Sequence, residues 1–500
     1  MRLRYLFVIV AAASLVSCFK DDTTLGTGAI SEIKIDSICE VYNINQNDTL
    51  VINPTVTQTN QPKELTYTWE IELKSDSLSH GKSFVFVGKQ FGSYRCRLIV
   101  ENSDGKAFFP FVIHVNTIYE EGLTIISKDA DGKAMLSFML TPPDGSEPTG
   151  FMHGDQFFIN NEESLADNPT DIVQSDGSLI IACRGSNDGS VPATIYRLNE
   201  KTFFLENMAS EPNFTDFKPT ILGIPEETSA GRSYPIICEG GNTYEYSPNE
   251  GVISKPLKLP YAYAQTAFVR SKGRGSYNFL CWDDSINALC QIYDGYAPAY
   301  YYGEEYQMKR EMIIDNSKNN PLNGLELRKI VLIEQDDTIR TEPQALIITK
   351  DARFYYKTLL SVEFWEHVGG KNELTDDGGK KRCGAGSIEL ALTDTTPCLA
   401  KYKGKSMLFA EGNKVRSWEY ISSTAIYDAK ILHTIDSESA VITSLALSTD
   451  QTKVYVAFYE PEQTGLNGSV WVVGADSDTI YNKYENVCYQ PVKIIYKKKN

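Results

Sequence analysis

The chain has 500 residues, with 48 Lys and Arg against 65 Asp and Glu, which gives a net charge of −17. Hydrophobic residues make up 42% and charged residues 23%, values typical of globular proteins that exclude a chain disordered throughout. So acidic a chain repels phosphate backbones, which argues against a nucleic-acid partner. A length roughly three times that of a typical domain predicts several domains or one large repeat architecture. The 29 Tyr and 5 His residues favour a β-rich binding protein over an acid–base enzyme.

The first residues have the pattern of a secretory signal. Arg2 and Arg4 precede an apolar run over 5–16, which is too short to remain as a membrane-spanning helix. Ser17 stands directly before Cys18, and this end of the run resembles the bacterial lipobox. The resemblance implies that residues 1–17 are a lipoprotein signal peptide and that Cys18 becomes the diacylated N-terminus, which would anchor the protein stably. An ordinary signal peptide with an incidental Cys is the alternative.

The segment after this Cys bears on location. Lys20, Asp21 and Asp22 resemble the surface-export signal of Bacteroidota lipoproteins, which implies the extracellular face of the outer membrane. A generic polar tether is the alternative. Cleavage after residue 17 would remove two arginines and deepen the net charge to −19. Residues 18–30 are short, polar and rich in Gly and Thr, so we expect a flexible lipidated tether.

Residues 31–117 are predicted to form a β-sandwich. Short alternating strands recur at about ten-residue spacing and are separated by turns such as Asp104-Gly105. Trp69 on a central strand and Tyr94 before a late strand suit the core of an immunoglobulin-like fold. The order Tyr67-x-Trp69, then Gly92-x-Tyr94, then Asp-Gly resembles PKD-like domains, and the resemblance implies that fold across these residues.

Residues 118–500 show a repeated pair of strands, and the whole chain is therefore predicted to be all-β. The pairs return about every 45–60 residues, which is typical of β-propeller blades. We expect about seven blades, with two β-sandwiches or a β-helix as the alternatives. The clearest copy comprises strands over 442–447, 453–458 and 469–473.

The ten cysteines do not suggest a disulfide framework. Once Cys18 is set aside, nine scattered cysteines remain and none forms a Cys-x-x-Cys pair, so a zinc ribbon is not supported. Most lie in apolar strand-like runs, as Cys183 and Cys238 do, and are predicted to be buried free thiols. Cys281 and Cys290 are a local exception that the sequence leaves open.

Enzyme signatures are missing from the sequence. It contains no His-Glu-x-x-His, no Gly-x-Ser-x-Gly, no P-loop and no dinucleotide fingerprint, so we expect no catalytic residue, metal or cofactor. Residues 129–132 resemble the start of a calcium loop but lack its later ligands, which favours a hairpin turn. A glycosidase pair of carboxylates stays open, because any acidic chain can supply one.

The most distinctive local feature is a Tyr-rich segment over 293–306. Tyrosine combines a large contact area with a polar tip, which suits recognition of a peptide, a sugar or a partner protein. The alternative is that the rings pack on the propeller. The candidate binding residues are Tyr296, Tyr300, Tyr301, Tyr302 and Tyr306.

The lipobox, the export signal, the PKD-like pattern and the strand repeat together resemble the PKD-like family lipoproteins of Bacteroidota. The resemblance implies a non-catalytic surface lipoprotein that is accessory to a SusC/SusD-type outer-membrane importer and its other lipoproteins. Its ligand would be an oligopeptide or a glycan, with the peptide favoured because exposed Trp pairs are not evident. A surface hydrolase, peptidase or glycosidase, that feeds the importer is the alternative, and a ligand-free scaffold is a third reading.

Overall fold

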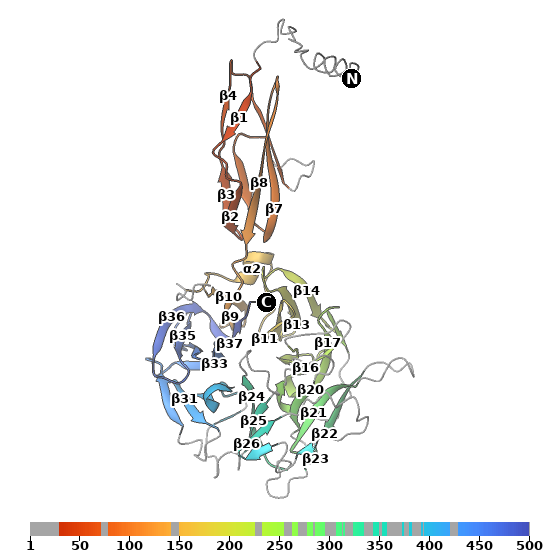
Figure 1. Cartoon of the computed structure of the whole chain (residues 1–500). Coiled ribbons are helices and arrows are strands. Elements are labelled where there is room, and N and C mark those ends of the chain that lie inside the picture. Colours follow the sequence, from red (N-terminus) through yellow and green to blue (C-terminus); the bar gives the residue numbers. More distant parts are fainter. Residues whose placement is uncertain are drawn as a thin grey trace, which may run out of the picture. The chain divides into compact units, whose positions relative to one another are not determined.

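The computed structural model shows an all-β protein (Figure 1). It describes residues 30–71, 79–141, 150–225, 233–254, 263–268, 278–283, 286–295, 307–312, 314–315, 324–334, 344–349, 353–357, 373–374, 380–382, 392–393, 395–420 and 429–499. The chain divides after Thr117 into two compact units, unit 1 and unit 2. Within the described residues the one α-helix is α2 (Gln156–Asn161).

Unit 1 contains one four-stranded sheet and two two-stranded sheets. The larger sheet has the order β2-β8-β7-β5, in which β2 and β8 are parallel and the other pairs antiparallel. Its strands are β2 (Val41–Asn45), β5 (Thr66–Ile71), β7 (Gly92–Asn102) and β8 (Gly105–Asn116). The smaller sheets pair β1 (Ile33–Asp36) with β4 (Thr55–Gln58), and β3 (Thr49–Ile52) with β6 (Phe84–Val87).

These three sheets share one hydrophobic core. Buried and exposed residues alternate along β7 and β8, so each strand turns one face inward. Trp69 is fully buried and stacks on Phe84 with ring centroids 4.9 Å apart, while Phe111 meets it edge-on at 6.0 Å. The Trp69 indole N–H donates to the Gly81 carbonyl at 2.9 Å. The prediction that Trp69 belongs to the core is confirmed, but its strand β5 is the edge of the sheet and not a central strand, because β7 is its one neighbour among the described strands of the sheet.

Unit 2 is a succession of antiparallel meanders arranged around a centre, which is the architecture of a β-propeller (Figure 1). One four-stranded meander consists of β11 (Pro169–Ser175), β12 (Ser178–Cys183), β13 (Thr194–Asn199) and β14 (Leu205–Ser210), and the next of β15 (Pro219–Leu222), β16 (Tyr234–Cys238), β17 (Thr243–Ser247) and β18 (Val252–Ser254). A third consists of β19 (Tyr263–Phe268), β20 (Asn278–Asp283), β21 (Ala288–Gly295) and β22 (Gln307–Met312). Later in the chain, a further meander consists of β33 (Val441–Leu447), β34 (Lys453–Tyr459), β35 (Gly468–Gly474) and β36 (Ile480–Cys488). The strand copy predicted over 442–473 is confirmed by β33, β34 and β35.

An eight-stranded sheet joins two further meanders. Their strands are β24 (Leu327–Glu334), β25 (Gln344–Thr349), β26 (Arg353–Lys357), β28 (Lys380–Arg382); and β29 (Cys398–Lys401), β30 (Ser406–Glu411), β31 (Lys414–Glu419), β32 (Lys430–Thr434). The two halves meet through a short parallel pairing of the inner strands β24 and β29. A separate two-residue pair connects β23 (Ile314–Asp315) with β27 (Glu373–Leu374).

The last strand of the chain completes the first sheet of unit 2. β37 (Gln490–Lys497) pairs antiparallel with β9 (Gly122–Lys128), which in turn pairs with β10 (Ala134–Leu140). β37 is therefore the inner strand of that sheet, and β9 is buried along nearly all its length. Pairing the two ends of the unit joins its first and last sheets, which protects edges that would otherwise stay unpaired.

A β-bulge recurs at the start of the inner strands. The register shifts by one residue near the beginning of β11, β15, β19, β24, β33 and β37. Pro169, Pro219 and Pro491 stand directly before the extra residue in three of them, where a residue without an N–H costs no ladder bond. We call the end of unit 2 at which the inner strands begin the N-rim.

Candidate binding pocket at the N-rim

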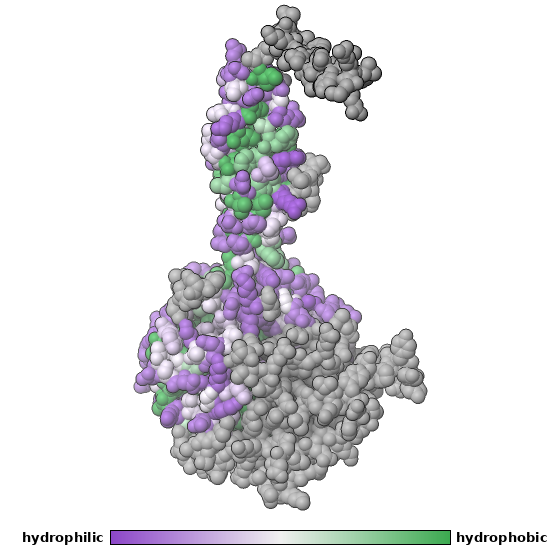
Figure 2. Space-filling model, in the orientation of Figure 1, coloured by the Kyte–Doolittle hydropathy of each residue, from purple (hydrophilic) through white to green (hydrophobic). Residues whose placement is uncertain are grey.

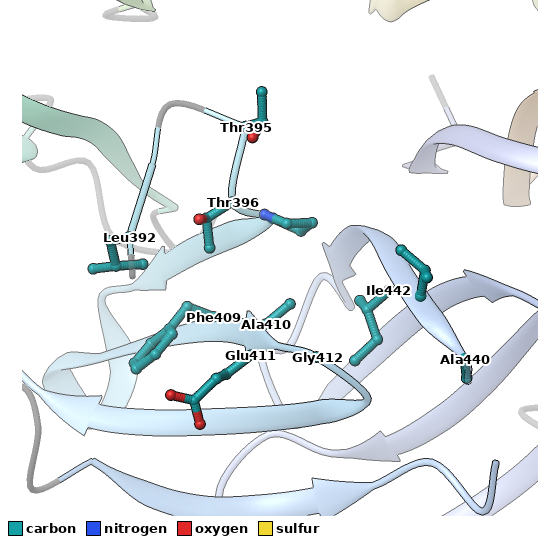
Figure 3. A pocket seen from close by; sticks show the side chains of 11 residues that line it. Leu392, Thr395, Thr396, Phe409, Ala410, Glu411, Gly412, Ala440 and Ile442 are labelled. Atoms are coloured by element: carbon teal, nitrogen blue, oxygen red, sulfur yellow. The ribbon is translucent and has the colours of Figure 1, made fainter. Parts of the chain in front are cut away.

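A pocket of about 340 Å³ opens at the N-rim between two successive meanders (Figure 3). Its walls come from the segment before β29, from the end of β30 and from the start of β33. The apolar lining consists of Leu392, Pro397, Phe409, Ala410, Ala440, Val441 and Ile442. The volume falls in the range of small-ligand pockets, roughly 300–1,000 Å³.

The pocket forms where two hydrophobic clusters separate. Leu392 and Phe409 belong to the cluster shared with β24 and β25, whereas Ala440 and Ile442 belong to the cluster that joins β29–β31 to β33–β35. Neighbouring residues of β30 point to opposite faces of the sheet, so Phe409 packs in the first cluster and Ala410 against the second. The Ala410 N–H donates to the Pro397 carbonyl at 2.9 Å and fixes the segment before β29 against β30.

The polar side of the pocket carries one carboxylate and two hydroxyl groups. Glu411 Oε2 accepts from Arg416 Nε at 2.5 Å, and Arg416 Nη1 donates to the Ala429 carbonyl at 2.9 Å. Within the part of the chain that the structure describes, Glu411 Oε1 accepts no hydrogen bond. Thr395 and Thr396 also line the pocket, and their hydroxyls lie 3.0 and 3.3 Å from Thr393 Oγ1, while Thr396 Oγ1 accepts the Thr393 N–H at 2.9 Å.

More acidic groups flank the β33 side of the pocket. Glu460 Oε2 accepts the hydroxyls of Ser437 and Ser439 at 2.8 and 2.9 Å. These two serines lie in the turn that leads to Ala440 on the pocket wall, and Glu438 stands between them. The mouth therefore combines apolar walls with carboxylates, and Arg416, which bonds Glu411, is already paired.

The anchor and export residues Cys18, Lys20, Asp21 and Asp22 are outside the described residues, as are Tyr296, Tyr300, Tyr301, Tyr302 and Tyr306. The pocket itself was not predicted, because its three wall segments are far apart in sequence. The run Thr395-Thr396-Pro397 before an apolar strand is the one local signal that could have indicated a shaped loop there.

The structure gives local roles to several titratable residues. His114 Nδ1 lies 2.8 Å from Ser93 Oγ on unit 1, and the buried His433 Nε2 lies 2.9 Å from the Gly474 carbonyl on unit 2. Asp129 Oδ1 accepts the N–H groups of Asp131 and Lys133, which confirms the predicted hairpin turn. Among the described residues, no three His, Cys, Asp or Glu side chains cluster in an arrangement suited to a metal ion.

Most of the cysteines in the described part of the chain are buried free thiols, as the sequence predicts for the majority. Cys96, Cys183, Cys238, Cys290 and Cys488 are buried, whereas Cys39 is exposed. Burial raises the pKa of the Cys238 thiol to about 12, so this sulfur is protonated and unreactive at neutral pH. Cys290 lies opposite Cys281 in the β20–β21 ladder and is a free thiol.

Comparisons with known proteins find structural likeness at low similarity. No family model matches the chain, and no curated protein matches it. A quinoprotein alcohol dehydrogenase-like protein from Bacteroides thetaiotaomicron is 14% identical, with 94% of this chain and 100% of that chain covered and a TM-score of 0.49. Apo AztD from Citrobacter koseri is 10% identical, with 75% and 97% covered and a TM-score of 0.41. The WD40 domain of SCAP from fission yeast is 9% identical, with 74% and 87% covered and a TM-score of 0.36.

At such low similarity, no activity can be inferred for this chain from these proteins. The propeller architecture follows from the sheet topology of this chain. Among the helices of the described residues, none has the length and apolar character needed to cross a membrane.

Proposed function

We propose that the protein is a lipid-anchored, non-catalytic binding protein on the outer face of the outer membrane, accessory to a SusC/SusD-type importer. The anchor part of the proposal is supported by the sequence around Cys18 and by the export-like residues Lys20, Asp21 and Asp22. Lipidation at Cys18 would hold the protein beside a transporter in the same membrane, where a captured ligand could be passed on.

We further propose that unit 1 is an immunoglobulin-like, PKD-like sandwich. The buried Trp69 supports this assignment, since such folds pack a Trp in the core between their sheets. The Tyr94 hydroxyl supports it as well, because it donates to the Gln90 carbonyl at 2.7 Å, a link of the tyrosine-corner type.

The observation that carries the binding role is the N-rim pocket of unit 2. It offers a volume suited to a small ligand or to one residue of an oligomer, with apolar walls and a few polar groups at the mouth. The Tyr-rich segment over 293–306 is proposed as a second contact surface for the ligand or for the transporter.

The test is affinity purification of the tagged protein from detergent-solubilised outer membrane, followed by mass spectrometry of proteins and retained small molecules. A SusC/SusD pair should co-purify, and the preparation should not hydrolyse peptides or glycans. The Cys18→Ser variant is the matched control, because it should leave the membrane and lose the transporter. Recovery of the lipidated protein alone, with nothing bound, would overturn the accessory role, and turnover of either substrate would favour the hydrolase.

A further inference from the structure

We propose that the N-rim pocket binds an aliphatic side chain of an extended peptide, whose N–H groups are directed at Glu411. The inference rests on the proposed binding function and narrows it to one ligand class and one site.

The walls of the pocket determine what enters it. Pro397, Ala410 and Val441 keep exposed carbon surface on the lining, whereas Leu392, Ala440 and Ile442 are almost fully buried beneath it, so the pocket offers aliphatic surface and little hydrogen bonding. An aliphatic side chain gains free energy on leaving water for such a site, whereas a polar side chain loses its hydration without a replacement.

The same walls disfavour a sugar. Sugar rings are held by stacking on an exposed aromatic face, together with a fan of hydrogen-bonding groups. Phe409 is the one aromatic side chain among the lining residues, and it is only 1% exposed, so its ring face is already covered by protein. Apart from the hydroxyls of two threonines, Glu411 supplies the only polar side-chain group in the lining.

The charges at the mouth select for hydrogen-bond donors. Glu411 Oε1 is an acceptor, and the carboxylates of Glu438 and Glu460 add negative potential on the β33 side. Arg416 is held by Glu411 and by the Ala429 carbonyl, so it offers little to an anionic ligand. A carboxylate or phosphate ligand is therefore repelled, while peptide N–H groups or a free α-ammonium group are attracted.

The test is isothermal titration of the purified full-length lipoprotein in detergent with three ligands. These are the capped pentapeptide Ala-Ala-Leu-Ala-Ala, the same peptide with Ser in place of Leu, and maltopentaose. The Leu peptide should bind at least tenfold more tightly than the Ser peptide, and maltopentaose should not compete with it. Equal affinity for the two peptides, or preferred binding of the sugar, overturns the inference.

Two variants tie the binding to the pocket. Val441→Asp places a charge on the pocket wall and should weaken binding of the Leu peptide at least tenfold. Val252→Asp is the matched control. Val441 and Val252 are both exposed residues at the start of a strand, with exposed fractions of 40% and 47%, and Val252 lies on another meander. The same melting temperature for both variants would show that the loss is local, and equal effects of the two substitutions contradict the site.

A third variant tests the role of the carboxylate. Glu411→Gln should lower affinity for a peptide with a free α-ammonium group more than for its acetylated form, and an unchanged ratio contradicts the role of Glu411. If the importer co-purifies but no peptide binds, this inference fails while the accessory function stands. If neither the importer nor a peptide is retained, both fail.

Discussion

The ammonium group of Lys493, on the last strand β37, forms an ion pair with the carboxylate of Asp171 on the inner strand β11. The other oxygen of this buried carboxylate, Oδ2, accepts the N–H of Leu222 on the inner strand β15 at 2.8 Å. One side chain therefore connects the inner strands of three successive sheets around the centre of unit 2.

The same arrangement recurs two sheets earlier in the ring. Ser444 Oγ on β33 accepts the N–H of Ile494 on β37 at 3.1 Å. Ser444 and Asp171 both stand one residue after a bulge, and the amides that they accept stand two residues after the bulge of the next inner strand. The bulge thus aims a side chain along the ring so that it satisfies a backbone amide that the neighbouring sheet leaves open.

Substitution of Asp171 should therefore be costly. Asp171→Ala removes the partner of Lys493 and leaves the Leu222 amide unsatisfied, so we expect a loss of about 2–4 kcal/mol in the free energy of unfolding. Asp171→Asn keeps an acceptor and should cost less. Urea denaturation followed by circular dichroism measures both. Asp36→Ala breaks the exposed Lys34–Asp36 pair and serves as a control expected to cost below about 1 kcal/mol; equal losses at the two sites would contradict the assignment.

The pH dependence of stability should respond to Lys497 at the end of β37. Its side chain is 0% exposed, its Nζ donates to the Glu120 carbonyl at 2.5 Å, and burial lowers its pKa to about 8. Because this pKa is below that of the unfolded chain, near 10.5, burying the ammonium group costs stability at neutral pH. That cost should disappear as the pH rises from about 8 to about 10.5.

Lys497→Met removes the titrating group and should flatten this dependence. We expect the variant to gain relative to the wild type at pH 7, by up to about 3 kcal/mol, and to lose that advantage by pH 10.5. Melting temperatures of both proteins across this pH range provide the measurement. A constant difference between the two proteins would show that Lys497 does not carry the effect.

The core of unit 1 should depend on Trp69. Trp69→Ala leaves a cavity beside Phe84 and Phe111, and large-to-small core changes of this kind cost about 3–5 kcal/mol. Hydrogen exchange of peptides from β7 and β8 should accelerate strongly in the variant. Phe108→Ala, at a residue 55% exposed on the outer face of β8, should change exchange little. Comparable acceleration in both would contradict a core centred on Trp69.

The membrane attachment should depend on Cys18. Cys18→Ser should shift the protein from the membrane pellet to the soluble fraction and abolish labelling by a radioactive fatty acid. Cys39→Ser changes an exposed free thiol and should leave both measurements unchanged. Retention of Cys18→Ser in the membrane pellet would exclude the lipid anchor.

Local patterns in the sequence predict much of the fold. The run Val454 to Phe458 is continuously apolar, lies between turn residues, and forms β34 as expected. Cys183 and Cys238 stand in apolar runs and are buried, as their neighbours predict. In these places a short apolar run bounded by turn residues carries the information.

Features that depend on distant residues were not predicted. β37 is recognisable as a strand only through its partner β9 at the other end of unit 2, and the residues of β37 do not indicate which strand it pairs with. The N-rim pocket is likewise assembled from segments around Pro397, Ala410 and Val441, which only the folded ring brings together. The bulges were missed because a single extra residue leaves the apolar pattern almost intact.

The closing strand also sets the timing of folding. Tyr496 on β37 donates to Glu121 beside β9 across a sequence separation of 375 residues, and β9 gains its inner neighbour only when β37 has been synthesised. Contacts between such distant residues form slowly, because a very long loop must close before they stabilise anything. Unit 2 can therefore complete its ring only after β37 has been made, so its earlier sheets must form before the ring closes.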